Sequence, residues 1–167
     1  GPAFQAYSRH GLRISYPPAE VMVNMPGHDL DGLTFSPNYD WFYFNSDDTG
    51  EIYKSAVTSQ VRLDPPIEIV DLWEGFEQLD GMTVDECGSL YVTITDGRIR
   101  RIDPTTGAVQ NFPQIPGGWT TSLHFGAGVG GWLRDHLYVM DRSGGIYDIP
   151  VGINGMWQPH HPAVTIP

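Results

Sequence analysis

The chain is poor in cysteine, in basic residues and in long hydrophobic runs. Its only cysteine is Cys87, so an internal disulfide and a zinc site built from several cysteines are both excluded. Only 9 Lys and Arg stand against 20 Asp and Glu, for a net charge of -11 over 167 residues. Nucleic acids and anionic membranes are bound through basic surfaces, so this charge argues against both partners. No run of apolar residues is long enough to span a bilayer.

Turn-forming and aromatic residues are abundant instead. The chain has 20 glycines and 14 prolines, whereas these two residues together average about 12% of a protein. Aromatic residues make up 12% of the chain, which is too many for a disordered segment. The composition therefore indicates one folded domain with a real core and many turns.

An internal repeat organises the sequence. Leu30–Phe35 (LDGLTF) recurs as Leu79–Val84 (LDGMTV), and a weaker third copy is Thr120–Phe125 (TTSLHF). Each copy is followed by an apolar-Tyr-apolar segment and then by a Gly-x-Ile segment. These lie at 42–44, 90–92 and 137–139, and at 50–52, 97–99 and 144–146. The same three features in the same order, three times, indicate three copies of one structural unit.

The repeated segments have the character of strands. They are four to six residues long, rich in Val, Ile, Tyr, Phe and Thr, and separated by turn residues. A fourth strand is expected in each unit, near 67–72, 108–112 and 163–166. No stretch keeps a helical period over three turns, so we expect an all-β protein with almost no helix.

Four strands per unit and a period of 41 to 49 residues are typical of a β-propeller blade. We predict antiparallel four-stranded blades over 29–78, 79–118 and 119–167. Residues 1–28 are expected to end a preceding blade, with strands over 11–15 and 20–24. A closed propeller needs at least about four blades, and three and a half leave two blade faces open. We therefore expect the ring to be closed by a missing half, which we favour, or by a second copy of the chain.

The central stretch resembles the gluconolactonase/regucalcin (senescence marker protein) family. The similarity is strongest from Leu79-Asp80-Gly81-Met82 through Gly88-Ser89-Leu90-Tyr91-Val92 to Asp103-Pro104-Thr105-Thr106-Gly107. It continues in the Thr-Thr-Ser segment at 120–122 and the glycines between 144 and 155. Family members are six-bladed propellers of about twice this length, and the chain matches their C-terminal half.

The resemblance implies a metal site and a reaction. Family enzymes hold a divalent cation, usually calcium, at the mouth of the channel, and they hydrolyse lactones or esters. Asp80 matches a family aspartate, which the resemblance implies to be a metal ligand and general base. Asp31 stands where the family usually has asparagine and would be a second ligand. Thr121 holds the matching place in the third blade, where it would contact substrate. The family's glutamate ligand from the first blade has no counterpart here, so the site would need a partner to be complete.

Other interpretations remain open at this point. Asp-Gly is a common turn pair, so either aspartate could serve only the backbone, and Thr121 could be an ordinary residue at the start of a strand. The chain could also be a non-catalytic propeller that binds a ligand or a protein, or a structural fragment without activity. Three further motifs are interpreted as structural: a hairpin turn at 45–50, a glycine-rich loop at 126–131, and a packing role for His124. The pair His160-His161 is not expected to bind metal.

Overall fold

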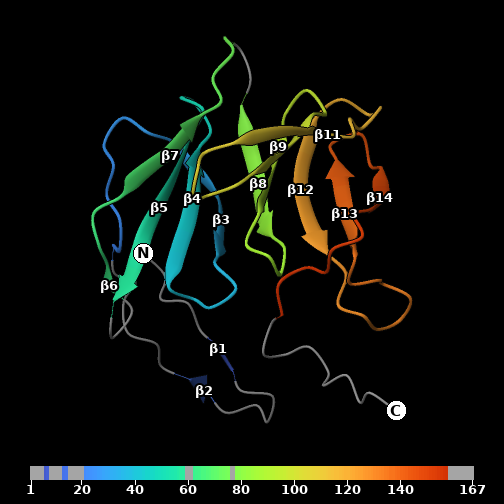
Figure 1. The fold of residues 1–167 in the computed structure, drawn as a ribbon, viewed down its shortest axis with the longest axis horizontal. Helices are drawn as coiled ribbons and strands as arrows, with labels where there is room; N and C mark the ends of the chain where they lie inside the picture. The colour runs from blue at the N-terminus through green and yellow to red at the C-terminus, as the bar shows by residue number, and fades with distance from the viewer. Residues whose placement is uncertain (1–5, 8–12, 15–20, 59–61, 76–77, 158–167) are drawn as a thin grey trace.

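The computed structural model describes residues 6–7, 13–14, 21–58, 62–75 and 78–157. All regular structure in these residues is β-strand, as the repeat predicts. In this part of the chain no helix has the length and hydropathy needed to cross a bilayer. Figure 1 shows three antiparallel sheets side by side, in chain order from left to right. These are the blades of a partial propeller.

The first blade is built from the first copy of the repeat. Its strands are β3 (Leu30–Phe35), β4 (Trp41–Ser46), β5 (Glu51–Thr58) and β7 (Ile67–Asp71). A short strand, β6 (Arg62–Leu63), also pairs with the end of β5 and was not predicted, since two residues are too few to show a pattern. The predicted fourth strand at 67–72 is confirmed as β7.

The second and third blades repeat this meander. The second blade contains β8 (Leu79–Val84), β9 (Leu90–Ile94), β10 (Ile99–Ile102) and β11 (Val109–Phe112). The third contains β12 (Thr120–Phe125), β13 (His136–Asp141) and β14 (Ile146–Pro150). The strand expected near 163–166 and the pair His160-His161 lie outside the described residues.

The region before the first blade differs in part from the prediction. Strands β1 (Ala6–Tyr7) and β2 (Arg13–Ile14) pair with each other, and β2 lies within the predicted segment 11–15. The strand expected over 20–24 was wrong for residues 21–24, which form no strand. Val21 is 80% exposed. The alternating valines satisfy the strand pattern, but a strand also needs a neighbouring edge with which to exchange hydrogen bonds.

Two hydrophobic cores lie between the three blades. The first joins Tyr43 and Ile52 of the first blade to Met82 and Val92 of the second. The second core lies on the other face of the central blade. It includes Tyr91, Ile99, Leu123, Phe125 and Val139. The central blade is thus covered on both sides.

Each outer blade has one face that no other described blade covers. We call the face of the first blade that carries Leu33 the leading face, and the face of the third blade that carries Ile146 the trailing face. Leu33 is 58% exposed and Ile146 is 63% exposed. Their counterparts in the central blade, Met82 and Ile99, are buried in the two cores.

Candidate functional site

The innermost strands β3, β8 and β12 each contain a bulge at the same place. The pairing of each with its second strand shifts register between Leu30 and Leu33, between Leu79 and Met82, and between Thr120 and Ser122. The residues at these shifts include Asp31, Asp80 and Thr121, which we call the bulge row. A β-bulge adds an unpaired residue and re-aims its side chain, and bulges are frequent beside active sites. All three predicted site residues therefore occupy equivalent positions in three neighbouring blades.

The glycine after each aspartate lets neighbouring innermost strands touch. A Cβ on Gly32 would overlap the carbonyl oxygen of Asp80, and a Cβ on Gly81 would lie 2.8 Å from Cα of Ser122. Both pairs, Asp31-Gly32 and Asp80-Gly81, lie inside strands rather than in turns. Neither pair therefore forms a turn, whereas the alternative that the aspartates serve only the backbone stays open, since the backbone N–H of Gly81 interacts with the Asp80 carboxyl group. Glycine is needed here because a side chain would force the strands apart.

Asn45 fixes the first bulge to the second blade. Its side chain is fully buried in β4. The backbone N–H of Gly32 donates to Oδ1 of Asn45 at 2.8 Å, and Nδ2 of Asn45 donates to the carbonyl of Asp80, also at 2.8 Å. Thr93 holds the same position in β9, and its hydroxyl donates to the carbonyl of Gly81 at 3.3 Å. Backbone groups that the bulge removes from the ladder thus find side-chain partners.

Sequence reasoning missed Asn45 because it placed this residue in the hairpin turn. The turn itself, which follows β4, is confirmed: Gly50 N–H donates to the carbonyl of Ser46 at 3.1 Å. The signal that could have located Asn45 is the polar residue two places after the central tyrosine in the first two copies, Asn45 after Tyr43 and Thr93 after Tyr91. A buried polar side chain in a strand requires a hydrogen-bond partner.

Carboxylates gather around Asp80. Burial of this partly buried side chain, together with the negative charges of Asp31 and Asp47, raises the pKa of Asp80 to about 6. Burial and the charges of Asp31, Asp29 and Asp48 likewise raise the pKa of Asp47. The charge of Asp31 acts on both Asp47 and Asp80, which places the three side chains in one electrostatic neighbourhood. Sequence reasoning did not include Asp47, which enters because β4 ends beside the start of β3.

The bulge row fits part of a metal site. Carboxylate oxygens are the ligands that hard divalent cations prefer, and calcium takes six to eight oxygen ligands. Asp31 and Asp80 offer such oxygens in neighbouring blades, and Thr121 adds a hydroxyl in the third. Within the described ranges, no three or more His, Cys, Asp or Glu side chains are arranged to hold a metal ion. The described residues thus offer two carboxylates of the kind that an oxygen-rich site needs, and they do not complete such a site.

A hollow lies further along the same strands, beyond the bulge row. It has a volume of about 290 Å³ and is lined in part by Thr34 of β3, Thr83 of β8 and His124 of β12. His124 is exposed on this side, and its Nδ1 lies 2.6 Å from the carbonyl oxygen of Phe125. The glycine-rich segment Gly126–Gly131 forms the predicted loop between β12 and β13. Thus a small solvent-open space lies beside the innermost strands of all three blades.

Comparisons with known proteins agree with this architecture. Residues 21–141 match the family model described as the SMP-30/gluconolactonase/LRE-like region. A luciferin-regenerating enzyme has a TM-score of 0.65 at 23% identity, with 75% of this chain covering 46% of that one. The calcium-binding protein regucalcin from Agrobacterium tumefaciens has a TM-score of 0.61 at 17% sequence identity. Here 77% of this chain covers 47% of that one. A gluconolactonase from Xanthomonas campestris has a TM-score of 0.55 at 20% sequence identity. Here 75% of this chain covers 37% of that one.

These solved structures share the propeller fold with this chain at low sequence identity. The chain spans less than half the length of each of them. A search of curated proteins finds no match to this chain.

Proposed function

This chain belongs to the SMP-30/gluconolactonase/LRE-like family, and from that premise we propose that it supplies half of a metal-dependent hydrolase that opens lactones or related esters. The single observation that carries the proposal is the pair Asp31 and Asp80 on equivalent bulges of neighbouring blades. The gluconolactonase from Xanthomonas campestris supports the class of reaction. The calcium-binding regucalcin supports a divalent cation, for which calcium is our choice.

Asp80 would serve as the general base. A base works best when its pKa lies near the working pH, and the pKa of Asp80 is raised to about 6 by burial and by Asp31 and Asp47. At neutral pH the Asp80 side chain is ionised in most molecules, and the carboxylate can accept a proton from an attacking water. Its backbone carbonyl is held by Asn45 at 2.8 Å, so the bulge that carries it is fixed. The side chain is thus positioned by the fold rather than by a mobile loop.

Asp31 and Asp80 would hold the cation together, and Thr121 would offer its hydroxyl to the substrate. The chemistry that a bound divalent cation supplies in such a site is polarisation of the lactone carbonyl. A cation would also offset the repulsion between these two carboxylates. The remaining ligands would come from a partner, either the missing half of the propeller or a second copy of this chain. The leading and trailing faces are where such a partner would dock.

One observation favours a second candidate function, a propeller that binds a ligand without catalysis. The described residues hold no complete set of metal ligands, and Asp31 stands where the family usually has asparagine. A site of this kind would bind a cation or a polar molecule and leave it unchanged. Turnover of a lactone separates the two functions.

The test measures calcium binding and lactone hydrolysis in the assembly that the chain forms. Calcium binding is followed by calorimetry, and acid release from glucono-δ-lactone by a pH indicator. We expect Asp80→Asn to abolish calcium binding and to lower the hydrolysis rate by at least about 100-fold, the usual effect of losing a general base. Asp64→Asn, which alters an exposed carboxylate away from the bulge row, is the matched control. Unchanged calcium affinity in Asp80→Asn would refute the metal role. Calcium binding without any hydrolysis above the spontaneous rate would favour the binding module.

A further inference from the structure

The side-chain amide of Asn45 joins the two bulges that carry Asp31 and Asp80. Asn45 lies in β4 of the first blade, and its side chain is fully buried. Its Oδ1 accepts a hydrogen bond from the backbone N–H of Gly32, the residue after Asp31, at 2.8 Å. Its Nδ2 donates to the backbone carbonyl of Asp80, in the second blade, also at 2.8 Å. We call this pair of hydrogen bonds the Asn45 bridge.

Asparagine suits the bridge through its chemistry. The N–H of Gly32 is a donor and needs an acceptor, whereas the carbonyl of Asp80 is an acceptor and needs a donor. A primary amide offers one of each at the end of a short side chain, and the two partners fix which way the amide faces. Aspartate would place a second acceptor against the carbonyl, and threonine has only one hydroxyl for two partners. Neither residue reproduces both bonds.

Gly32 leaves the space that this amide occupies. A Cβ on Gly32 would lie 2.8 Å from Nδ2 of Asn45 and would overlap the carbonyl oxygen of Asp80. Glycine inside a strand often marks a place where another part of the chain approaches closely. Asn45 and Gly32 are therefore parts of one arrangement, which brings the first innermost strand directly against the second.

The bridge is specific to the boundary between the first and second blades. Thr93 holds the place of Asn45 in the second blade, but its hydroxyl donates within its own blade. Met140 holds this place in the third blade, and its side chain has no N–H or O–H group to donate. The second boundary is tied instead by the hydroxyl of Thr120, which donates to the carbonyl of Ile94 at 2.6 Å. In the described blades, a side chain that joins two bulges is thus not a general requirement of packing.

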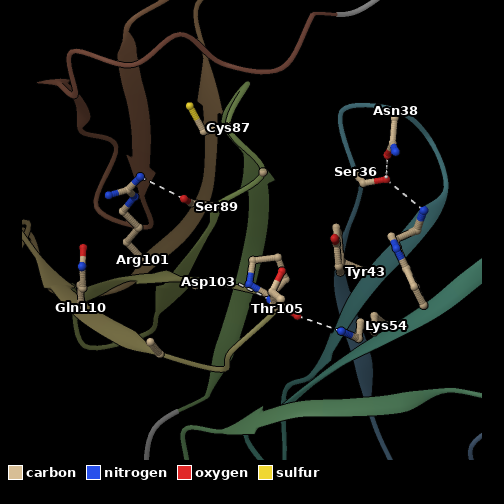
Figure 2. Close-up of a pocket in the computed structure, with 14 residues that line it drawn as sticks. Ser36, Asn38, Tyr43, Lys54, Cys87, Ser89, Arg101, Asp103, Thr105 and Gln110 are labelled. Atoms are coloured by element: carbon tan, nitrogen blue, oxygen red, sulfur yellow. Dashed lines mark hydrogen bonds between the residues drawn. The ribbon is translucent and has the colours of Figure 1, made fainter.

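A second hydrogen bond crosses the same boundary away from the bulge row. The ammonium of Lys54, in β5, donates to the carbonyl of Pro104 at 2.9 Å (Figure 2). Both residues line a groove that is walled by the turns after β3 and β8, whereas the bulges are near the starts of these strands. Loss of the Lys54 bond therefore weakens the boundary without changing either bulge.

The bridge joins two bulges whose side chains repel each other. The negative charge of Asp31 disfavours a charge on Asp80, and two like charges gain free energy by moving apart. The Asn45 bridge opposes this separation, because a buried backbone group that loses its partner carries the full cost of desolvation. The bulges that are joined in this way are the two that carry carboxylates.

We propose that Asn45 is a positioning residue that holds the carboxylates of Asp31 and Asp80 close to each other across the blade boundary. It acts through two backbone groups, the N–H of Gly32 and the carbonyl of Asp80. The inference rests on the proposed function, in which these two carboxylates share a cation. Residues that orient metal ligands usually contribute roughly 10- to 100-fold to metal affinity.

A double-mutant cycle tests the positioning without any metal. Asp31→Asn, Asp80→Asn and the double variant are unfolded with urea at low salt near pH 8, where both carboxyl groups are ionised, with a chelator present. When Asn45 is present, repulsion should couple the two substitutions by at least about threefold in the equilibrium constant of unfolding. In the Asn45→Thr chain, where at most one bond of the bridge can form, the coupling should fall below about 1.7-fold.

Calcium affinity gives the second readout, by calorimetry in the assembly that the chain forms. Asn45→Thr should weaken calcium binding by about tenfold. Lys54→Gln is the matched control: it removes a hydrogen bond of the same boundary and should leave calcium affinity unchanged. Circular dichroism checks that each variant is folded, and Asn45→Ser replaces Asn45→Thr if the latter does not fold.

The proposal is overturned by any of three results in folded protein. The first is coupling between Asp31 and Asp80 that is absent from the unsubstituted chain or unchanged in Asn45→Thr. The second is unchanged calcium affinity in Asn45→Thr. The third is an equal loss of calcium affinity in Lys54→Gln, which would indicate a general weakening of the boundary. Absence of calcium binding to the unsubstituted protein would instead refute the proposed metal site, and the metal-free cycle would still decide the role of Asn45.

Discussion

The two inner boundaries between blades and the two outer blade faces are built from the same repeated residues in opposite environments. Ile52, Ile99 and Ile146 occupy the same place in the three Gly-x-Ile segments. The first two are fully buried, whereas Ile146 is 63% exposed. On the opposite faces, Met82 and Leu123 are at most 7% exposed, whereas their counterpart Leu33 is 58% exposed.

This contrast teaches that each repeat encodes a blade with two apolar faces, whether or not a neighbouring blade covers them. Burial of apolar surface contributes roughly 25 cal/mol per Å², so each uncovered face is a source of association free energy. The leading and trailing faces carry the same apolar pattern as the covered faces, and we propose that another blade covers them. We expect the effects of substitution to follow the presence of a neighbour rather than the identity of the residue.

The largest expected effect comes from truncating equivalent isoleucines in the two environments. Ile99→Ala should lower the free energy of unfolding by about 2 to 5 kcal/mol, because it leaves a cavity in the second core. Ile146→Ala should change it by less than about 0.5 kcal/mol in the chain alone, because the side chain is already exposed. Urea unfolding followed by tryptophan fluorescence measures both. Equal losses in the two variants would show that the trailing face is covered in solution.

A smaller effect is expected where the innermost strands touch. Gly81→Ala would place a Cβ 2.8 Å from Cα of Ser122, and we expect a loss of about 1 to 3 kcal/mol from overpacking. Ser122 is the residue equivalent to Gly81 in the third blade, where no following blade is described, so Ser122→Ala is the matched control and should be nearly neutral. Thermal unfolding compares the two. If Gly81→Ala unfolds at the same temperature as the unsubstituted chain, the close approach of β8 and β12 does not require glycine at this position.

The fold was accessible from sequence because its signals are local and repeated. The central tyrosines fall in β4, β9 and β13, and the isoleucines of the Gly-x-Ile segments fall at or next to the start of β5, β10 and β14. The strand predicted over 20–24 from its valine pattern alone was wrong at residues 21–24. These residues form no strand, because a strand also needs a neighbouring strand edge with which to pair. Three copies of a pattern supply the evidence of pairing that a single copy lacks.

The site was accessible only in part. The equivalence of Asp31 and Asp80 follows from the repeat, but the reason for the glycine after each lies in a strand of the neighbouring blade. Asn45 and Asp47 could not be assigned because their roles depend on contacts with groups up to 35 residues away. The hydrogen bond from Lys54 to Pro104 has the same origin, since it joins two blades. The repeat in the sequence predicts the blades, whereas contacts between residues of different blades can be assigned only from the three-dimensional structure.

Electrostatics at the bulge row should produce a pH-dependent effect of moderate size. The pKa of Asp80 is raised to about 6, so the folded state holds its proton more tightly than the unfolded state does. Stability should therefore fall as pH rises from about 4 to 6, and the cost should persist above pH 6. Asp80→Asn should raise the free energy of unfolding at neutral pH by on the order of 1 kcal/mol, after allowance for solvent screening.

The comparison of unfolding at two pH values tests this assignment. The gain from Asp80→Asn should disappear below about pH 3, where the carboxyl is protonated in both states. Calcium added to the unsubstituted chain at neutral pH should stabilise it but leave Asp80→Asn unaffected. Loss of stability in Asp80→Asn at neutral pH would contradict a carboxylate whose ionised form is disfavoured by the fold.

The smallest effect on the stability of the chain, and the sharpest test of the comparison, is expected from a charge on the trailing face. Ile146→Lys should change the free energy of unfolding by less than about 0.5 kcal/mol, since a lysine at an exposed position remains solvated. The same change should prevent association, because closing the ring would bury an unpaired ammonium. Val109→Lys, on the outermost strand of the central blade, is the matched control and should associate normally. Light scattering over a range of concentrations measures the mass.

A monodisperse 18.5 kDa species for the unsubstituted chain would show that neither face recruits a second copy. The partner would then have to be a separate propeller half, which should bind the unsubstituted chain and reject Ile146→Lys.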